Sequence, residues 1–154
     1  MSSKHIIIVA GEASGDLHGG LLARELRALD PGCELMGLGG RAMEEAGVRL
    51  IARSDEMGVT GLWEVLRHLP RLRRLLSSLS RELLADPPDA LIPIDYPDFN
   101  LRFAKEAHKR GIPIVYYISP QVWAWRSGRI KDIARLVTKM LVIFPFEEEL
   151  YKKF

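Results

Sequence analysis

The chain has 154 residues, of which 47% are hydrophobic and 27% are charged, and its formal net charge is +2. These values are typical of a soluble globular protein. A net charge this small gives no strong attraction to nucleic acid, so nucleic acid is not an expected partner. The single cysteine, Cys33, excludes an internal disulfide and fits a reducing cytoplasm. The N-terminal apolar run, Ile6 to Ala10, is too short for a signal peptide or a membrane span.

Short apolar, β-branched runs alternate along the chain with longer segments of helical periodicity. The first half predicts a strand over 5–10, a helix over 16–29, a strand over 33–40, a helix over 41–47 and a strand over 48–52. A long amphipathic segment over 61–85 follows. The second half predicts a strand over 89–95, a helix over 99–111, a strand over 112–119, a helix over 127–137, a strand over 139–144 and a last short helix. Near-continuous apolar strands that alternate with helices are typical of parallel sheets covered on both faces. The predicted fold class is therefore α/β, with a Rossmann-like, doubly wound, mostly parallel sheet forming one domain over 1–154.

Pro93 does not fit this pattern. It lies inside the apolar run 89–95, and a proline has no amide hydrogen to donate in a central strand. The sequence therefore predicts either an edge strand at this place or regular pairing that stops at about Ile92.

Ligands of open parallel sheets bind beyond the carboxyl ends of the strands, and three segments belong there. The first is AGEASGD, 10–16. Its glycines permit a tight turn, and Ser14 or Asp16 is expected to cap the following helix. The segment matches neither the dinucleotide-binding glycine pattern nor a nucleophile elbow. It is either a plain helix cap and turn or part of a binding site made of Glu12, Ser14, Gly15 and Asp16.

The second segment is IDYPDFN, 94–100. Asp95 ends a strand, and Asp98 stands where a helix beginning near Phe99 needs an N-cap. A carboxylate at the carboxyl end of a strand is well placed to take a proton from a sugar or alcohol hydroxyl. Asp95 is therefore the first candidate for a general base and Asp98 the second, with a structural acid as the alternative for each.

The third segment is YISPQVWAWRSGRIK, 117–131. Large rings beside fixed cations form a platform for a sugar face, a base or a phosphate. The alternative is that one tryptophan is a core residue and the other is half-exposed. The candidate binding residues here are Ser119, Gln121, Trp123, Trp125 and Arg126. No metal is expected, because the four histidines are scattered without a second ligand at a suitable spacing.

The segment 62–84 has leucines every three or four residues, and its arginines outnumber its two glutamates. Pro70 is expected to kink or split it. An apolar face flanked by arginines is typical of a helix that rests on an anionic membrane surface, although part of the segment must be an ordinary crossover helix. The candidate membrane-contact residues are Leu62, Trp63, Leu66, Arg67, Leu69, Arg71, Arg73 and Arg74.

Seven motifs resemble, in order, those of the lipid-A-disaccharide synthase family of bacterial glycosyltransferases: AGEASGD, GLGG, MGVTGLWEVL, IDYPDFN, YYISPQVWAWR, RIK and KMLVIFPFEEELYKK. The resemblance implies one Rossmann-like half of a GT-B fold and no cofactor. It also implies transfer of 2,3-diacylglucosamine from its UDP carrier to 2,3-diacylglucosamine 1-phosphate, with inversion, at the inner face of the cytoplasmic membrane. The position of the family's proposed base is Asp95, and Asp98 and Asn100 are expected to cap the helix and hold the loop.

The sequence departs from the family pattern at two places. Arg41 stands where a proline is common, and Tyr96 stands where a small residue often separates the acid from the proline. The resemblance covers the family's N-terminal half, so we expect the UDP-sugar domain to be absent and the chain to be inactive alone. The alternatives are a non-catalytic membrane- or lipid-binding module and, less well supported, a nucleotide-binding domain.

Overall fold

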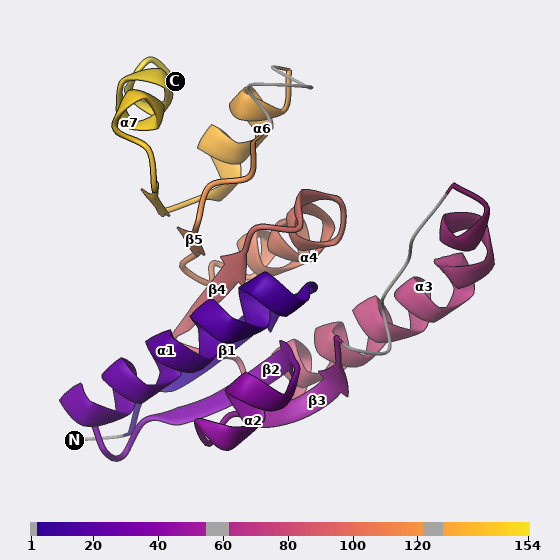
Figure 1. The fold of residues 1–154 in the computed structure, drawn as a ribbon, viewed down its shortest axis with the longest axis vertical. Helices are drawn as coiled ribbons and strands as arrows, with labels where there is room; N and C mark the ends of the chain where they lie inside the picture. The colour runs from indigo at the N-terminus through magenta and orange to yellow at the C-terminus, as the bar shows by residue number, and fades with distance from the viewer. Residues whose placement is uncertain (1–2, 55–61, 122–127) are drawn as a thin grey trace.

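A six-stranded parallel sheet forms the centre of the fold in the computed structural model, which describes residues 3–54, 62–121 and 128–154 (Figure 1). For residues 62–68 the side chains are not described. The strand order is β3-β2-β1-β4-β5-β6. The strands are β1 (His5–Ala10), β2 (Glu34–Gly39), β3 (Arg49–Arg53), β4 (Ala90–Ile94), β5 (Val115–Tyr117) and β6 (Lys139–Leu141). Every pairing between these strands is parallel, which confirms the predicted α/β, Rossmann-like fold class.

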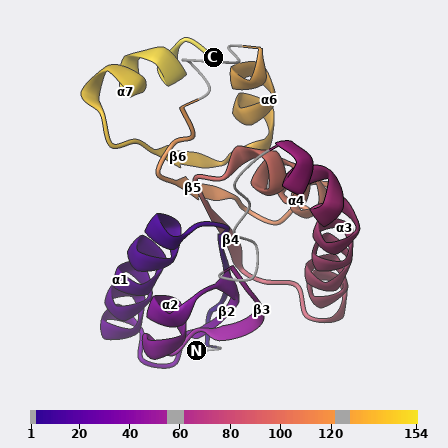
Figure 2. The same cartoon turned by 45° about the vertical axis from the view of Figure 1, so that its right-hand side comes forward.

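The helices lie on both faces of the sheet, as Figure 2 shows. They are α1 (Ala13–Leu29), α2 (Arg41–Glu45), α3 (Leu62–Ala85), α4 (Pro97–Lys109), α6 (Arg129–Leu136) and α7 (Pro145–Lys152). Helices α1 and α2 cover one face and α3 and α4 the other, whereas α6 and α7 lie beside β5 and β6. The chain turns from one side of β1 to the other between β3 and β4, so the topological switch point lies between β1 and β4. A doubly wound sheet binds its ligands there, outside the carboxyl ends of the strands.

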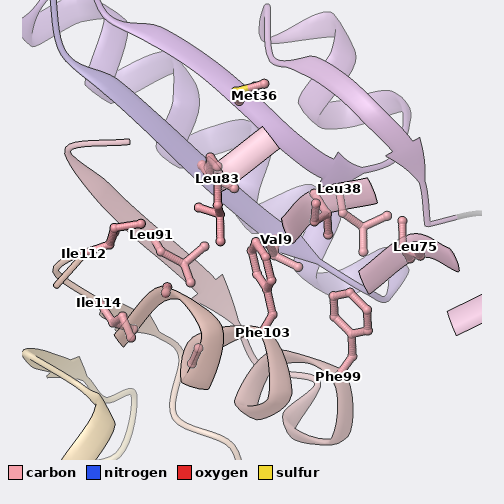
Figure 3. Close-up of a cluster of buried hydrophobic side chains, with 14 residues drawn as sticks. Val9, Met36, Leu38, Leu75, Leu83, Leu91, Phe99, Phe103, Ile112 and Ile114 are labelled. Atoms are coloured by element: carbon pink, nitrogen blue, oxygen red, sulfur yellow. The ribbon is translucent and has the colours of Figure 1, made fainter. Parts of the chain in front are cut away.

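Two apolar layers hold the helices against the sheet. Under α3 and α4, Leu79 and Leu83 are fully buried one helical turn apart and meet Phe103 of α4 in the cluster drawn in Figure 3. Burying each of these side chains contributes about 1.5–3 kcal/mol. On the other face, a Cβ atom at Gly20 of α1 would lie 2.7 Å from the carbonyl oxygen of Ala42. Glycine at this position therefore lets α1 approach α2 at backbone distance.

Both expectations for Pro93 are wrong. Strand β4 is an interior strand, and its pairing with β1 continues past Pro93 to Ile94. The amides of Leu91 and Asp95 donate toward β5, to the carbonyl oxygens of Pro113 and Tyr117. Since alternate residues of a parallel strand face the same neighbour, the missing amide of Pro93 also faces β5. Pro93 therefore removes one hydrogen-bond donor from the pairing of β4 with β5, a strand of three residues. The pairing of β4 with β1 is unaffected.

Helix α3 runs without a break from Leu62 to Ala85 although Pro70 lies inside it. Of the two outcomes expected of Pro70, a kink or a split, the split is therefore wrong. Within the described residues, no helix combines the length and apolar content that crossing a bilayer requires. The buried side of α3 packs on the sheet through Leu75, Leu79 and Leu83. This part of the segment is therefore an ordinary crossover helix, as expected. The described arginines Arg71, Arg73 and Arg74 are exposed.

Candidate functional site

A cavity with a volume of about 280 Å³ opens at the carboxyl edge of the sheet, beside the start of α1. Its polar lining is Ser14, His18 and Asp95. The rest of the lining is Gly15, Tyr117 and apolar residues from the ends of three strands, namely Ile94, Ile118, Leu141, Val142 and Ile143. A few convergent polar groups on a largely apolar wall are typical of a small-molecule site. The cavity lies at the switch-point edge that the topology indicates.

The backbone around this cavity has a left-handed conformation at three residues. Asp95 and Tyr96, directly after β4, both have φ of 43°, and Ile118, directly after β5, has φ of 63°. Such values are uncommon outside glycine and are rare for a β-branched residue. They cost on the order of 1–3 kcal/mol each and concentrate at functional sites, because the surrounding structure must enforce them. Here they place Asp95 and Ile118 on the cavity wall.

Two buried side chains fix the Asp95 turn. The Tyr116 hydroxyl donates to the Asp95 carbonyl oxygen at 2.6 Å, and Asn100 Nδ2 donates to the same oxygen at 2.7 Å. Asn100 Nδ2 also donates to the carbonyl oxygens of Ile94 (3.1 Å) and Val9 (3.5 Å). Asn100 and Tyr116 are both 0% exposed. Asn100 thus holds the loop through these hydrogen bonds, as predicted.

The Asp95 carboxyl group is half-buried and has an altered acidity. Burial raises the pKa of Asp95, the nearby charge of Glu12 raises it further, and a hydrogen bond from the Tyr96 amide opposes both. A carboxylate with a raised pKa is a stronger base toward a hydroxyl group. Asp95 therefore combines a place on the cavity wall with a raised pKa.

The AGEASGD segment divides between the cavity and the fold. Ser14 and Gly15 line the cavity, whereas neither Ser14 nor Asp16 caps α1, whose N-cap is Glu12 without a side-chain hydrogen bond. The predicted cap is therefore wrong. Asp16 instead caps α2: its carboxylate accepts bonds from the amides of Gly40 (2.7 Å), Ala42 (3.0 Å) and Met43 (3.0 Å). Gly40, the N-cap of α2, has no side chain of its own to offer.

Asp98 was expected to be the N-cap of α4, and this prediction is wrong. The N-cap of α4 is Tyr96, and Pro97 begins the helix, a position that suits proline because no amide donor is needed there. Asp98 lies in the first turn, is exposed, and accepts a hydrogen bond of 2.7 Å from Arg129 Nη2. Only one of the two aspartates, Asp95, lines the cavity.

The third segment is described only in part. Ser119 is buried, and its hydroxyl lies 2.6 Å from that of Tyr151 on α7, while Gln121 is exposed. Trp123, Trp125 and Arg126 lie outside the described residues. The side chains of Leu62, Trp63, Leu66 and Arg67 also lie outside them, and Leu69 is half-buried.

His18, Tyr117 and the segment 141–143 also line the cavity, although they were not among the predicted site residues. His18 follows Ser14 by four residues, so both lie on one face of α1, and this spacing was the available signal. Leu141 ends β6, and the carboxyl ends of all parallel strands lie at one edge, so the topology pointed to this segment as well. In the described part of the chain, no three His, Cys, Asp or Glu side chains gather as metal ligands would.

Comparison with known proteins relates residues 6–154 to the lipid-A-disaccharide synthetase family, whose profile matches them. The lipid-A-disaccharide synthase of Geobacter sulfurreducens is 52% identical over 152 residues, which is 99% of this chain and 40% of the relative. That of Geobacter metallireducens is 53% identical over 98% of this chain, and that of Coxiella burnetii is 49% identical over 99%. The chain spans about 40% of the length of these curated relatives.

Proposed function

The chain belongs to the lipid-A-disaccharide synthase family, glycosyltransferases of lipid A biosynthesis, and on this premise we propose that it supplies the acceptor-binding part and the general base of that enzyme. The proposed reaction transfers 2,3-diacylglucosamine from a UDP carrier to 2,3-diacylglucosamine 1-phosphate. The donor is bound by the part of the family enzyme that the chain does not span. The acceptor is bound in the cavity at the carboxyl edge of the sheet.

In the proposed step, the 6-hydroxyl of the acceptor attacks the anomeric carbon of the donor while its proton passes to the Asp95 carboxylate. The new bond joins the acceptor oxygen to that carbon, and the bond from the carbon to the UDP oxygen breaks with its electron pair. One displacement inverts the configuration and needs one base and no enzyme nucleophile. The UDP charge must be stabilised by hydrogen-bond donors and cations.

The observation that carries the proposal is the position of Asp95. Among the described residues it is the one carboxylate that lines the cavity, it follows the interior strand β4, and burial raises its pKa. Glu12, at the N-cap of α1, adds to this effect. Ser14 and Gly15 line the same cavity and would offer a sugar hydroxyl a hydroxyl group and a backbone without a side chain.

We further propose that the enzyme acts at the inner face of the cytoplasmic membrane, where α3 contacts anionic lipid. The support is that α3 carries three exposed arginines, Arg71, Arg73 and Arg74. The leucines on the buried side of the same helix pack in the core. Each basic residue near an anionic surface contributes about 1 kcal/mol to binding.

The test is complementation. The chain is coexpressed with the remaining part of a family enzyme, and UDP release is followed with both acylated substrates. We expect turnover by the pair and none by the chain alone, since one half of a two-sided site cannot bring donor to acceptor. Asp95→Asn should lower kcat by about a hundredfold or more, and the matched control Asp98→Asn by less than about tenfold. Unchanged turnover in Asp95→Asn would refute the assignment of the base.

The competing function is a non-catalytic lipid-binding module on the same surface. It predicts that anionic vesicles bind the chain equally well with and without Asp95→Asn and that no partner segment restores turnover. Turnover by the complemented pair excludes this alternative.

A further inference from the structure

A second groove lies between α3 and α4, on the opposite face of the sheet from α1. Its volume is about 170 Å³. The apolar lining comes from Leu69, Leu72 and Leu76 of α3 and from Phe99 of α4. The three leucines follow a spacing of three and four residues, so they lie on one face of α3. An apolar cavity of about 150 Å³ is large enough for a benzene ring, so this groove has room for roughly six carbon atoms.

The charges at the groove favour an anion. Arg73 of α3 and Arg102 of α4 line it from its two sides, and both are exposed. Its one acidic residue, Asp98, is bonded to Arg129 at 2.7 Å. Within the described residues, no carboxylate pairs with either Arg73 or Arg102. A guanidinium is well suited to a phosphate, because its planar donors match the phosphate oxygens.

The groove reaches the Asp95 turn through Tyr96. Tyr96 lines the groove, and Asp95, the preceding residue, lines the cavity on the other face. The Tyr96 ring packs on Gly11 at the end of β1, where a Cβ atom would lie 2.7 Å from ring atom Cγ. The adjacent residues Asp95 and Tyr96 therefore connect the cavity, which holds the candidate base, with the groove, which two arginines and four apolar side chains line.

We propose that this groove binds part of one acyl chain of the acceptor, with Arg73 and Arg102 beside the anionic group of the same molecule; the identity of the acceptor rests on the proposed function. The chemistry that the groove itself selects is a fatty chain joined to an anionic head. A chain longer than the slot continues along the exposed face of α3.

The first probe is dodecyl phosphate, below its critical micelle concentration, titrated into the isotopically labelled chain. We expect amide chemical shifts to change at Leu72, Leu76 and Phe99. The variant Leu72→Trp, which fills the groove, should raise the Kd about tenfold, and so should the double variant Arg73→Gln/Arg102→Gln, whose exposed side chains can change without loss of the fold. Leu84→Trp, at a 64% exposed position of α3 outside the groove, and Arg81→Gln should leave the Kd unchanged.

The second probe is a short-chain 2,3-diacylglucosamine 1-phosphate, followed at the groove amides and at Asp95. If dodecyl phosphate binds in the groove but this sugar does not bind, the assignment of the groove stands and the proposed function is refuted. Sugar binding at Asp95 with no shift in the groove would overturn the groove assignment. Equal weakening by Leu72→Trp and Leu84→Trp would also overturn it, because adsorption to the surface of α3 would then explain the binding.

Discussion

The hydroxyl group of Tyr116 and the amide nitrogen of Asn100 both donate to the carbonyl oxygen of Asp95, at 2.6 Å and 2.7 Å. Burial keeps the pKa of Tyr116 well above its usual range, so the hydroxyl remains a donor over the working pH range. The two bonds enforce the left-handed backbone that places the Asp95 carboxylate on the cavity wall. The candidate base is thus positioned through its own main chain.

Removing one of these bonds should reduce catalysis more than binding. In the complemented enzyme, we expect Tyr116→Phe to lower kcat about tenfold with little change in KM, and to lower the free energy of unfolding by about 1 kcal/mol. Steady-state UDP release and denaturant unfolding measure the two quantities. Tyr151→Phe is the control, because it removes a hydroxyl bonded to Ser119 at 2.6 Å without touching the Asp95 turn. Equal kinetic effects of the two variants would contradict the positioning role.

Asn100 gives a sharper test, because its amide faces three carbonyl oxygens and is fully buried. Asn100→Asp would turn a donor into a charged acceptor in that setting, and leaving a buried charge uncompensated costs about 3–5 kcal/mol. We expect this loss in denaturant unfolding at neutral pH, and a smaller loss at acid pH, where the introduced carboxyl group is protonated. Asn100→Ala should show a loss that does not depend on pH in this way. If the loss of unfolding free energy in Asn100→Asp did not depend on pH, the three hydrogen bonds from the Asn100 amide to carbonyl oxygens would be contradicted.

Much of the fold could be predicted, because strand and helix order follow from local apolar patterns. The runs around Ile8 and Leu91 are apolar on both faces, and both strands lie inside the sheet. Asp95 could be placed for the same reason, since a residue that ends such a run must lie at the carboxyl edge. Pro93 was wrongly expected to limit the strand, because a sequence does not state which neighbour an amide faces.

Side-chain partners distant in sequence could not be predicted. Asp16 was assigned to the nearest helix end, but it caps a helix whose first residues lie 24 to 27 positions further on. Asp98 has a good sequence position for an N-cap, yet α4 starts two residues earlier, after the left-handed turn at Tyr96, and the Asp98 carboxylate pairs with Arg129 instead. In both cases the tertiary packing decides which amide the carboxylate reaches.

Asp16 is therefore expected to affect stability strongly. Asp16→Ala would leave three amides at the start of α2 without their acceptor, two of them bonded at 3.0 Å and that of Gly40 at 2.7 Å. We expect a loss of about 2–3 kcal/mol in denaturant unfolding, since bonds to a charged acceptor are stronger than neutral ones. Asp30→Ala, which removes a single exposed bond of 3.2 Å to the Gly32 amide, should cost less than about 1 kcal/mol. Similar losses in the two variants would contradict the assignment of Asp16 as the cap of α2.

Membrane contact through α3 predicts a dependence on arginine charge that is separate from the groove. We expect Arg71→Gln/Arg74→Gln to weaken binding to vesicles containing anionic phospholipid by about 2 kcal/mol, or roughly thirtyfold, and the difference to shrink as salt rises. Vesicle sedimentation measures both effects. Lys131→Gln/Lys139→Gln removes the same charge at exposed positions elsewhere and should have little effect. Equal effects of the two pairs would indicate a general charge effect and refute a specific contact.

The raised pKa of Asp95 predicts that the candidate base is held at a cost to the fold. An aspartate whose pKa is higher in the folded than in the unfolded protein stabilises the fold when protonated, and this contribution is lost as pH rises through the folded value. Burial and the charge of Glu12 put Asp95 in this class, above an ordinary value of 3.8. At neutral pH, Asp95→Asn should therefore raise the midpoint of thermal unfolding, by less than about 4 °C because the carboxylate is still partly exposed. The gain should vanish below pH 3.8, where the wild-type carboxyl group is protonated in both states. Asp98→Asn, which loses an ion pair with Arg129, should show no gain at any pH. A neutral-pH loss of stability in Asp95→Asn would mean that the carboxylate is satisfied where it lies and is not a strained base.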